Sequence, residues 1–387
     1  MMTTVLSILP MMVCAFWSIV LILDWFAVHD KLRLWLWQFM TVAMLLYVGH
    51  AVFFNHYTPI LPFTDTLYCA CNLLVFPLYY VYIKGLSVPH YLDNRRQQLN
   101  DRCLLFIPPL VIALIIGVLY LMMSSAERSD FIETYLYHNQ FTGLSGLAFL
   151  QAVVHHIAKL CFAIQVITIF ILGYRHLQQY KIFIDNTYAD TENKRLEKVQ
   201  TILILFVVGV FLAFVSNIIG RWRFMDDTSL LAIPSLFFSA LLFLIGYVGS
   251  HTVFSISNVN DNEFTPSTPS MDNNDNEQTD SSLAVSLEQL MNEKYLYLQH
   301  DLKISDVAAL LCTNRTYVQH AILELSGESF TKYVNRKRIE YAIELQKNHP
   351  EYNIETIATQ SGYTHLGTFY RNYKTVTGKT PGKAGVL

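Results

Sequence analysis

Two similar stretches near the C-terminus read "LKISDVAALLCTNRTYVQHAI" (residues 302–322) and "NIETIATQSGYTHLGTFYRNYKTVTG" (residues 353–378). In the first stretch, the spacing of the apolar residues predicts a short helix, a polar break at 312–314 and a second helix from about Arg315. The inward residues are expected to be Ile304, Val307, Ala308 and Leu311 in the first helix, and Val318, Ile322 and Leu325 in the second.

The second stretch repeats this arrangement. Gly362 lies where a tight turn between helices needs a residue that tolerates a left-handed backbone, and Thr364 is expected to cap the following helix. The inward residues are expected to be Ile354, Ile357, Ala358, Phe369 and Tyr373. The pattern therefore predicts two helix-turn-helix units in tandem, a fold that places its second helix in the DNA major groove.

A longer set of positions between 304 and 381 fits one family pattern: Ile304, Val307, Ala308, Tyr317, Val318, Gly327, Ser329, Phe330, Tyr333, Arg338, Ile339, Ala342, Ile354, Ile357, Ala358, Gly362, Tyr363, Phe369, Arg371, Tyr373, Lys374, Gly378, Thr380 and Pro381. At these residues the chain resembles the AraC/XylS family of transcription regulators. Nothing before Ser282 takes part in the resemblance. One departure is Cys312, which stands in the first turn where the family favours Gly.

The resemblance implies which side chains face DNA. Base contacts are expected from Thr316, Gln319, His320, Leu366, Gly367, Thr368 and Arg371, because amide, guanidinium and methyl groups suit base edges. Phosphate contacts are expected from Asn314, Arg315, Asn372 and Lys374. A structural salt bridge is the alternative role of Arg371. The helix at about 329–347 joins the two units, and its basic cluster 336–338 could contact phosphates or form a solvated face.

Composition divides the chain into unlike parts. Hydrophobic residues make up 53% of the chain and charged residues only 15%, which is too apolar for an ordinary soluble protein. The net charge is −3, but residues 282–387 contain 12 Lys and Arg against 10 Asp and Glu. Apolar runs long enough to cross a bilayer recur before about residue 250. Seven membrane helices are expected, at about 5–27, 34–54, 60–83, 103–123, 147–172, 201–220 and 229–249.

The loop charges predict how these helices are oriented. The first, third and fifth loops together carry 11 Lys and Arg, and the second, fourth and sixth carry 3. By the positive-inside rule, the N-terminus is outside and the C-terminus is in the cytoplasm, where bacterial DNA lies. We therefore expect an all-α chain with a transmembrane bundle (1–256), a flexible acidic linker (257–282) and a DNA-binding domain (283–387). The apolar spacing of residues 283–297 predicts a helix that packs on the first helix-turn-helix unit.

A polar set inside the bundle is the candidate ligand site. His155 and Lys159 lie one helical turn apart with His156 beside them, and ionisable residues at membrane depth are costly. These three could bind an anionic ligand or report pH; alternatively, the region lies at the membrane interface. Further polar candidates for the bundle interior are Asp24, His50, Asn72, Gln151, Gln165 and Asn217.

No catalytic set, cofactor motif or metal-ligand spacing stands out, and the Cys69-x-Cys71 pair indicates neither a disulfide nor a metal site. The expected function is a membrane-embedded transcription regulator, with activation as the favoured mode and repression left open. Expected partners are promoter DNA and lipid; RNA polymerase, a second copy of the chain and a small-molecule or peptide effector remain open. One alternative is a transporter or channel-like protein with a regulatory cytoplasmic domain. Another is a passive membrane anchor that proteolysis at the linker releases.

Overall fold

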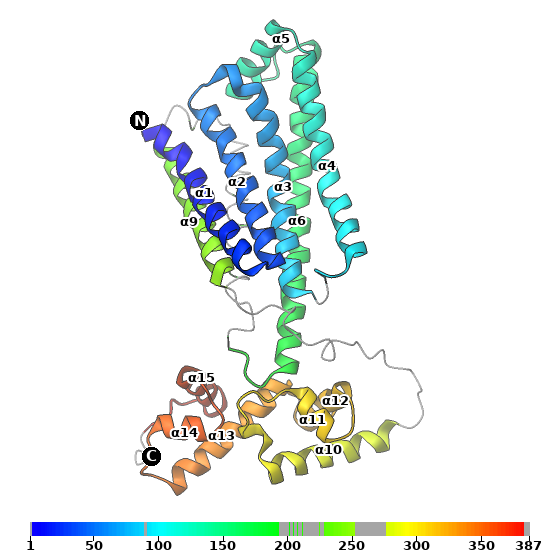
Figure 1. Cartoon of the computed structure of the whole chain (residues 1–387), viewed down its shortest axis with the longest axis vertical. Helices are drawn as coiled ribbons and strands as arrows, with labels where there is room; N and C mark the ends of the chain where they lie inside the picture. Colours follow the sequence, from blue (N-terminus) through cyan, green and yellow to red (C-terminus); the bar gives the residue numbers. More distant parts are fainter. Residues whose placement is uncertain are drawn as a thin grey trace. The chain divides into compact units, whose positions relative to one another are not determined.

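A computed structural model describes residues 2–88, 91–192, 228–251 and 276–382, with isolated positions between 201 and 224 (Figure 1). The chain divides into two compact units. The first comprises Met1–Gln178 and Leu196–Asn258, and the second comprises Gln179–Arg195 and Val259–Leu387. The described residues form helices and no strand, apart from one isolated bridge between Tyr188 and Lys303. The expected all-α fold class is confirmed.

Long apolar helices build the first unit. Among the described residues, six of them are long and apolar enough to cross a membrane, and five of these both begin and end within eight residues of the predicted bounds. They are α1 (Met2–Val28), α2 (Lys31–Phe54), α3 (Leu61–Ser87, preceded by the short η1 at Thr58–Ile60), α4 (Arg95–Met122), α6 (Gly146–Thr187) and α9 (Thr228–His251). The exception is α6, which runs well past the predicted end at 172. The predicted helix at 201–220 lies almost entirely outside the described residues.

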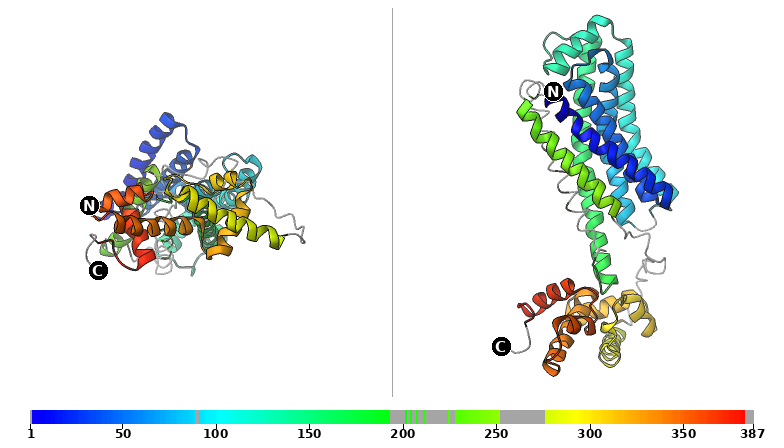
Figure 2. Two further views of the ribbon diagram at one scale, coloured as in Figure 1. Left: turned by 90° about the horizontal axis from the view of Figure 1, so that it is seen from below. Right: turned by 60° about the vertical axis from the view of Figure 1, so that its left-hand side comes forward.

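The helices of the first unit pack side by side. α2 lies between α1 and α3, and α9 lies against α1 although it comes from the far end of this unit's sequence (Figure 2). The approach of α9 to α1 is close because Gly246 faces Trp17: a Cβ at Gly246 would lie 2.4 Å from the indole ring. Ser235 in α9 also donates a hydrogen bond to the carbonyl of Leu6, at 2.6 Å. Small residues at such contacts are typical of helix packing in membranes.

Between α4 and α6, the chain forms α5 (Ser125–Asp130) and a π-helical turn, η2 (Phe131–Tyr137). Ser124 and Glu127 form a capping box at the start of α5. Phe131 and Tyr135 of η2 are buried in a core with residues of α2, α3, α4 and α6, including Val52, Tyr120 and Ala152. This core therefore ties the η2 turn to one end of the bundle.

The second unit contains six helices in its described part: α10 (Asn276–Lys294), α11 (Ile304–Leu310), α12 (Arg315–Ser326), α13 (Phe330–Asn348), α14 (Ile354–Gln360) and α15 (Leu366–Thr377); a short η5 (Leu296–Leu298) follows α10. α10 begins before the predicted residue 283. Its Leu287 and Met291 are fully buried against residues of α11 and α12, as expected. Residues 257–275 of the predicted linker lie outside the described residues.

Candidate nucleic-acid interface

The first helix-turn-helix unit consists of α11 and α12. Asn314 caps α12 by accepting hydrogen bonds from the backbone N–H groups of Thr316 (3.0 Å) and Tyr317 (3.2 Å). Cys312 in the turn has a left-handed backbone with φ of 51°. This conformation explains on physical grounds why glycine suits the position. Val318 and Ile322 are buried as predicted, whereas Leu325 is 39% exposed and its predicted inward position is wrong.

The second unit consists of α14 and α15. Gly362 has a φ of 83°, and a Cβ there would lie 2.8 Å from the carbonyl oxygen of Leu298 and 3.0 Å from Nε of Arg338. Glycine is therefore required both for its backbone conformation and for its lack of a side chain. Phe369 is buried as predicted. The predicted cap at Thr364 is wrong: the N-cap is His365, whose side chain makes no capping hydrogen bond.

The side chains expected to contact bases divide into two groups. Gln319 and His320 on α12, and Leu366, Gly367 and Arg371 on α15, are exposed. Thr316 and Thr368 are half-buried. An exposed polar side chain in the first turns of the second helix is what reading of base edges requires.

The side chains expected to contact phosphates are in more varied positions. Lys374 is exposed and Arg315 is half-buried. The oxygen of Asn314 is engaged in capping α12, and Asn372 Nδ2 donates to Asn335 Oδ1 at 3.0 Å. Asn314 and Asn372 thus hold the domain together, whatever they also contact.

The basic cluster on α13 divides into one buried residue, Arg338, and two partly exposed residues, Arg336 and Lys337. Arg338 is 1% exposed and donates hydrogen bonds to the carbonyls of Tyr297 (2.5 Å) and Gln299 (2.6 Å). Burial lowers the pKa of its guanidinium, although Tyr363, Asp190 and Asp301 act in the opposite direction. Arg336 forms ion pairs with Glu328 and Glu340, both at 2.9 Å. Arg338 therefore fits neither of the roles expected for this cluster; it joins the segment before α11 to the second helix-turn-helix unit.

A segment that directly follows α6 also belongs to the compact unit that contains both helix-turn-helix units. We call residues 188–192 the strap. Ala189 N donates to the Leu302 carbonyl (3.0 Å), and the strap carbonyls accept hydrogen bonds from α13: Thr331 donates to Tyr188 (2.5 Å) and Asn335 to Ala189 (3.1 Å). Tyr188 and Ala189 are both buried. A stretch expected to be a simple loop is thus built into the core of the helix-turn-helix domain.

The end of the strap contacts α15, the helix of the second helix-turn-helix unit that is expected to enter the major groove. Thr368 Oγ1, an expected base contact on α15, donates a hydrogen bond to the carboxylate of Glu192. Asp190, two residues earlier, acts electrostatically on the buried Arg338. The strap therefore places one acidic side chain, that of Glu192, beside the helix that is expected to enter the major groove.

The ligand residues predicted in the bundle of long apolar helices contact other side chains of that bundle. His155 Nε2 lies 2.8 Å from Asp65 Oδ2, His156 Nδ1 lies 2.9 Å from the Tyr135 hydroxyl, and Lys159 Nζ lies 5.4 Å from the centre of the Tyr135 ring. Asp65, the partner of His155, is not among the residues predicted from the sequence. The signal that could have found it is a carboxylate at membrane depth, four residues before Cys69 on the same helix.

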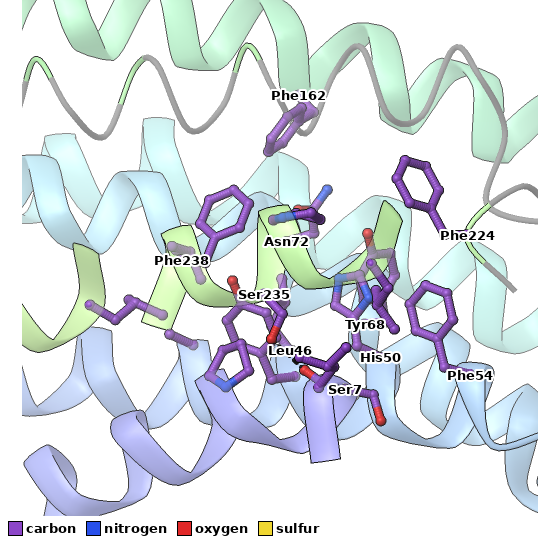
Figure 3. Close-up of a pocket in the computed structure, with 18 of the residues that line it drawn as sticks. Ser7, Leu46, His50, Phe54, Tyr68, Asn72, Phe162, Phe224, Ser235 and Phe238 are labelled. Atoms are coloured by element: carbon purple, nitrogen blue, oxygen red, sulfur yellow. Dashed lines mark hydrogen bonds between the residues drawn. The ribbon is translucent and has the colours of Figure 1, made fainter. Parts of the chain in front are cut away.

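A cavity of about 160 Å³ lies elsewhere in the first unit (Figure 3). Most of its lining is apolar and comes from α1, α2, α3 and α9. His50 and Asn72, two of the predicted interior polar residues, line it together with Ser7, Tyr68 and Ser235. Neither His155 nor Lys159 lines this cavity. The structure therefore separates the ionisable cluster from the cavity.

Comparison with known proteins identifies the C-terminal region that contains both helix-turn-helix units. Residues 307–384 match the family model described as a helix-turn-helix domain. No curated protein and no solved structure matches the chain. The match covers α12 to α15, with the turns, caps and exposed side chains described above, and it begins within α11. This chain therefore carries a helix-turn-helix domain of the AraC type at its C-terminus.

Proposed function

We propose that this chain is a membrane-embedded regulator that reads promoter DNA with α12 and α15 and activates transcription. The observation that carries the proposal is the pair of helix-turn-helix units, with Gln319, His320 and Arg371 exposed on their second helices. The six apolar helices of the described chain supply the membrane part. The bilayer and DNA are then the partners, and the signal reaches the DNA-binding domain from the membrane.

The strap supports the expected orientation. Its residues belong to the fifth loop, which the charge count assigns to the cytoplasm. Because Tyr188 and Ala189 pack within the helix-turn-helix domain, this loop and the domain must lie on the same side of the membrane. Two independent observations thus favour a DNA-binding domain in the cytoplasm.

The strap also offers a route for regulation. It continues directly from α6. The Glu192 carboxylate accepts a hydrogen bond from the Thr368 hydroxyl, which lies on the face of α15 that is expected to read bases. A carboxylate at this position repels phosphates, so DNA and the strap compete for α15. An effector of the membrane part would change DNA occupancy by binding the two strap states with different affinity. The cavity beside His50 and Asn72 is of a size and polarity that suit a small, mainly apolar effector.

Loss of the Arg371 side chain tests the DNA-reading assignment. Arg371→Ala should weaken binding to the cognate site by about 1–3 kcal/mol and relax preference at one base pair, because Arg pairs with guanine through two hydrogen bonds. Lys374→Ala is the matched control and should weaken binding to all sequences and flatten the salt dependence. Both are measured on the full chain in detergent, with a library of DNA sites. Unchanged specificity in Arg371→Ala would remove α15 from base reading.

Loss of the strap charge tests the competition. Glu192→Gln should raise the affinity for promoter DNA by about tenfold, and with it promoter occupancy, because a hydrogen bond to a charged group contributes about 1.5 kcal/mol and a tenfold change in affinity is about 1.4 kcal/mol. Ala189→Pro, which removes the N–H donated to Leu302, should act in the same direction. Glu351→Gln, an exposed carboxylate paired with His349, is the control. Equal occupancy in all three variants and the parent chain would show that the strap does not limit DNA binding.

A further inference from the structure

The buried cluster around His155 combines three kinds of metal donor. Asp65 and Cys69 lie one helical turn apart on α3, and His155 comes from α6; their donor atoms all lie within 4.8 Å of one another. All three residues are buried, with side chains exposed by 8% or less. A carboxylate oxygen, a thiol sulfur and an imidazole nitrogen that converge in this way form a donor set typical of zinc.

The donors are already oriented as they are in metal sites. His155 Nδ1 donates to the Gln151 carbonyl at 2.8 Å, which leaves Nε2 directed at the cluster. The Tyr120 hydroxyl, from α4, donates to Asp65 Oδ2 at 2.8 Å. Outer hydrogen bonds of this kind fix the tautomer and direction of metal ligands. The Phe131 ring, 5.2 Å from the imidazole, packs against His155 as well.

A further buried acceptor lies beside the cluster. Gln151 interacts with the Tyr120 side chain, and its Oε1 is buried with no hydrogen-bond partner among the described residues. A buried polar atom without a partner carries an energetic cost and calls for an explanation. A metal-bound water at the fourth coordination position would supply the missing donor.

We propose that Asp65, Cys69 and His155 bind one divalent transition-metal ion of the zinc type. The charge balance suits an apolar surrounding. With Zn²⁺ bound, the ligands would be one carboxylate, one thiolate and one neutral imidazole, because metal ligands must be deprotonated. The two anionic ligands would then balance the ion and leave no buried net charge.

The position of the site suggests what it does. The titratable groups that face His155 are Asp65 and Cys69 from α3, Tyr120 from α4, Tyr135 from η2 and the adjacent His156 on its own helix. Asp65 lies in the second turn of α3 and Tyr120 in the last turn of α4, at the helix ends expected to face outside. Because α6 carries His155 and leads directly to the strap, metal binding would act on the regulation proposed above, and this last step rests on that proposed function.

Cobalt titration of the purified full chain in detergent tests the site. We expect one Co²⁺ per chain, a thiolate-to-cobalt charge-transfer absorption and displacement by Zn²⁺. Cys69→Ser should abolish the charge-transfer absorption, and His155→Gln should abolish stoichiometric binding. Cys71→Ser and His156→Gln are matched controls from the same helices and should behave as the parent chain does. Absence of the absorption in the parent chain, or its survival in Cys69→Ser, would overturn the proposal and leave a histidine–aspartate pair that only joins α3 to α6.

A gentler variant covers the case in which Cys69→Ser or His155→Gln does not fold. Tyr120→Phe keeps the ring and removes only the hydroxyl that orients Asp65, so it should weaken metal binding by about 10-fold or more. Unchanged affinity in this variant would count against the site. Promoter occupancy measured with and without Zn²⁺ separates the two proposals: tight metal binding with constant occupancy would keep the site and reject its link to DNA binding.

Discussion

The two helix-turn-helix units have the same plan but are held in place differently. In both, a left-handed residue lies in the turn, at Cys312 in the first unit and at Gly362 in the second. The first unit packs its α12 against α10 and caps it with Asn314. The second has no side-chain cap on α15, and its turn instead lies against Leu298 and the buried Arg338. The second unit thus depends on distant parts of the chain, and these include the strap.

This difference suggests that the two helix-turn-helix units differ in how far their conformation can change. A unit stabilised by its own caps and an adjacent helix keeps one conformation, whereas a unit held by long-range contacts can respond when those contacts change. The strap engages the second unit through Glu192 and Thr368, and reaches it again through Asn335, which accepts from Asn372. The strap also contacts the first unit, because Ala189 donates to the Leu302 carbonyl, but its acidic end reaches α15. In the regulation proposed above, we therefore expect the second unit to respond more than the first.

The largest effect is expected at Arg338. Arg338→Ala should destabilise the second unit by roughly 4 kcal/mol, because it leaves the buried carbonyls of Tyr297 and Gln299 without their charged donor. Arg336→Ala, its neighbour with exposed ion pairs, should cost about 1 kcal/mol or less. Hydrogen exchange of the full chain in detergent measures both, through the amides of α13 and α14. Equal effects of the two substitutions would mean that Arg338 is not the residue that joins the units.

The second-largest difference is expected between substitutions in the two turns, at Gly362 and at Cys312. Gly362→Ala should cost roughly 3 kcal/mol, from a left-handed backbone at about 1–2 kcal/mol and a side chain forced against Leu298. Cys312→Gly should instead be neutral or stabilise the first unit by up to about 1 kcal/mol, because it relieves the left-handed strain and Cys312 is exposed. Thermal unfolding of the two variants gives the comparison. A tolerant Gly362→Ala would contradict the close contact described for this turn.

The smallest effect concerns the caps. His365→Asn should stabilise α15 by about 1 kcal/mol, because Asn at the N-cap can accept a backbone hydrogen bond that His365 does not accept. Asn314→Ala should cost α12 about the same amount, since it removes two such bonds. Helix protection in hydrogen exchange reports both changes. If His365→Asn has no effect, the start of α15 is stabilised by contacts other than capping.

Local patterns allowed much of this architecture to be predicted. Apolar runs indicated the six long helices of the described chain, and the periodicity around Val318 and Ile357 indicated the helix-turn-helix units. The errors arose where short-range signals compete: Thr364 precedes α15 but does not cap it, and Leu325 has helical spacing but lies past the contact with the core. Periodicity gives the face of a helix, but it does not show where the neighbouring element ends.

The sequence by itself determined the elements whose causes are local: helix length from apolar runs, turns from Gly362, and the AraC-type pattern of the C-terminal domain. Only the tertiary structure decided that Arg338 is buried, that the strap belongs to the DNA-binding domain, and that Asp65 and Cys69 meet His155. The physical reason is that each of these depends on groups far apart in the chain. A buried charge is stable only with its hydrogen-bonding partners, and a set of donor atoms can bind a ligand only when the atoms lie close together. Folding brings these partners together from distant parts of the chain.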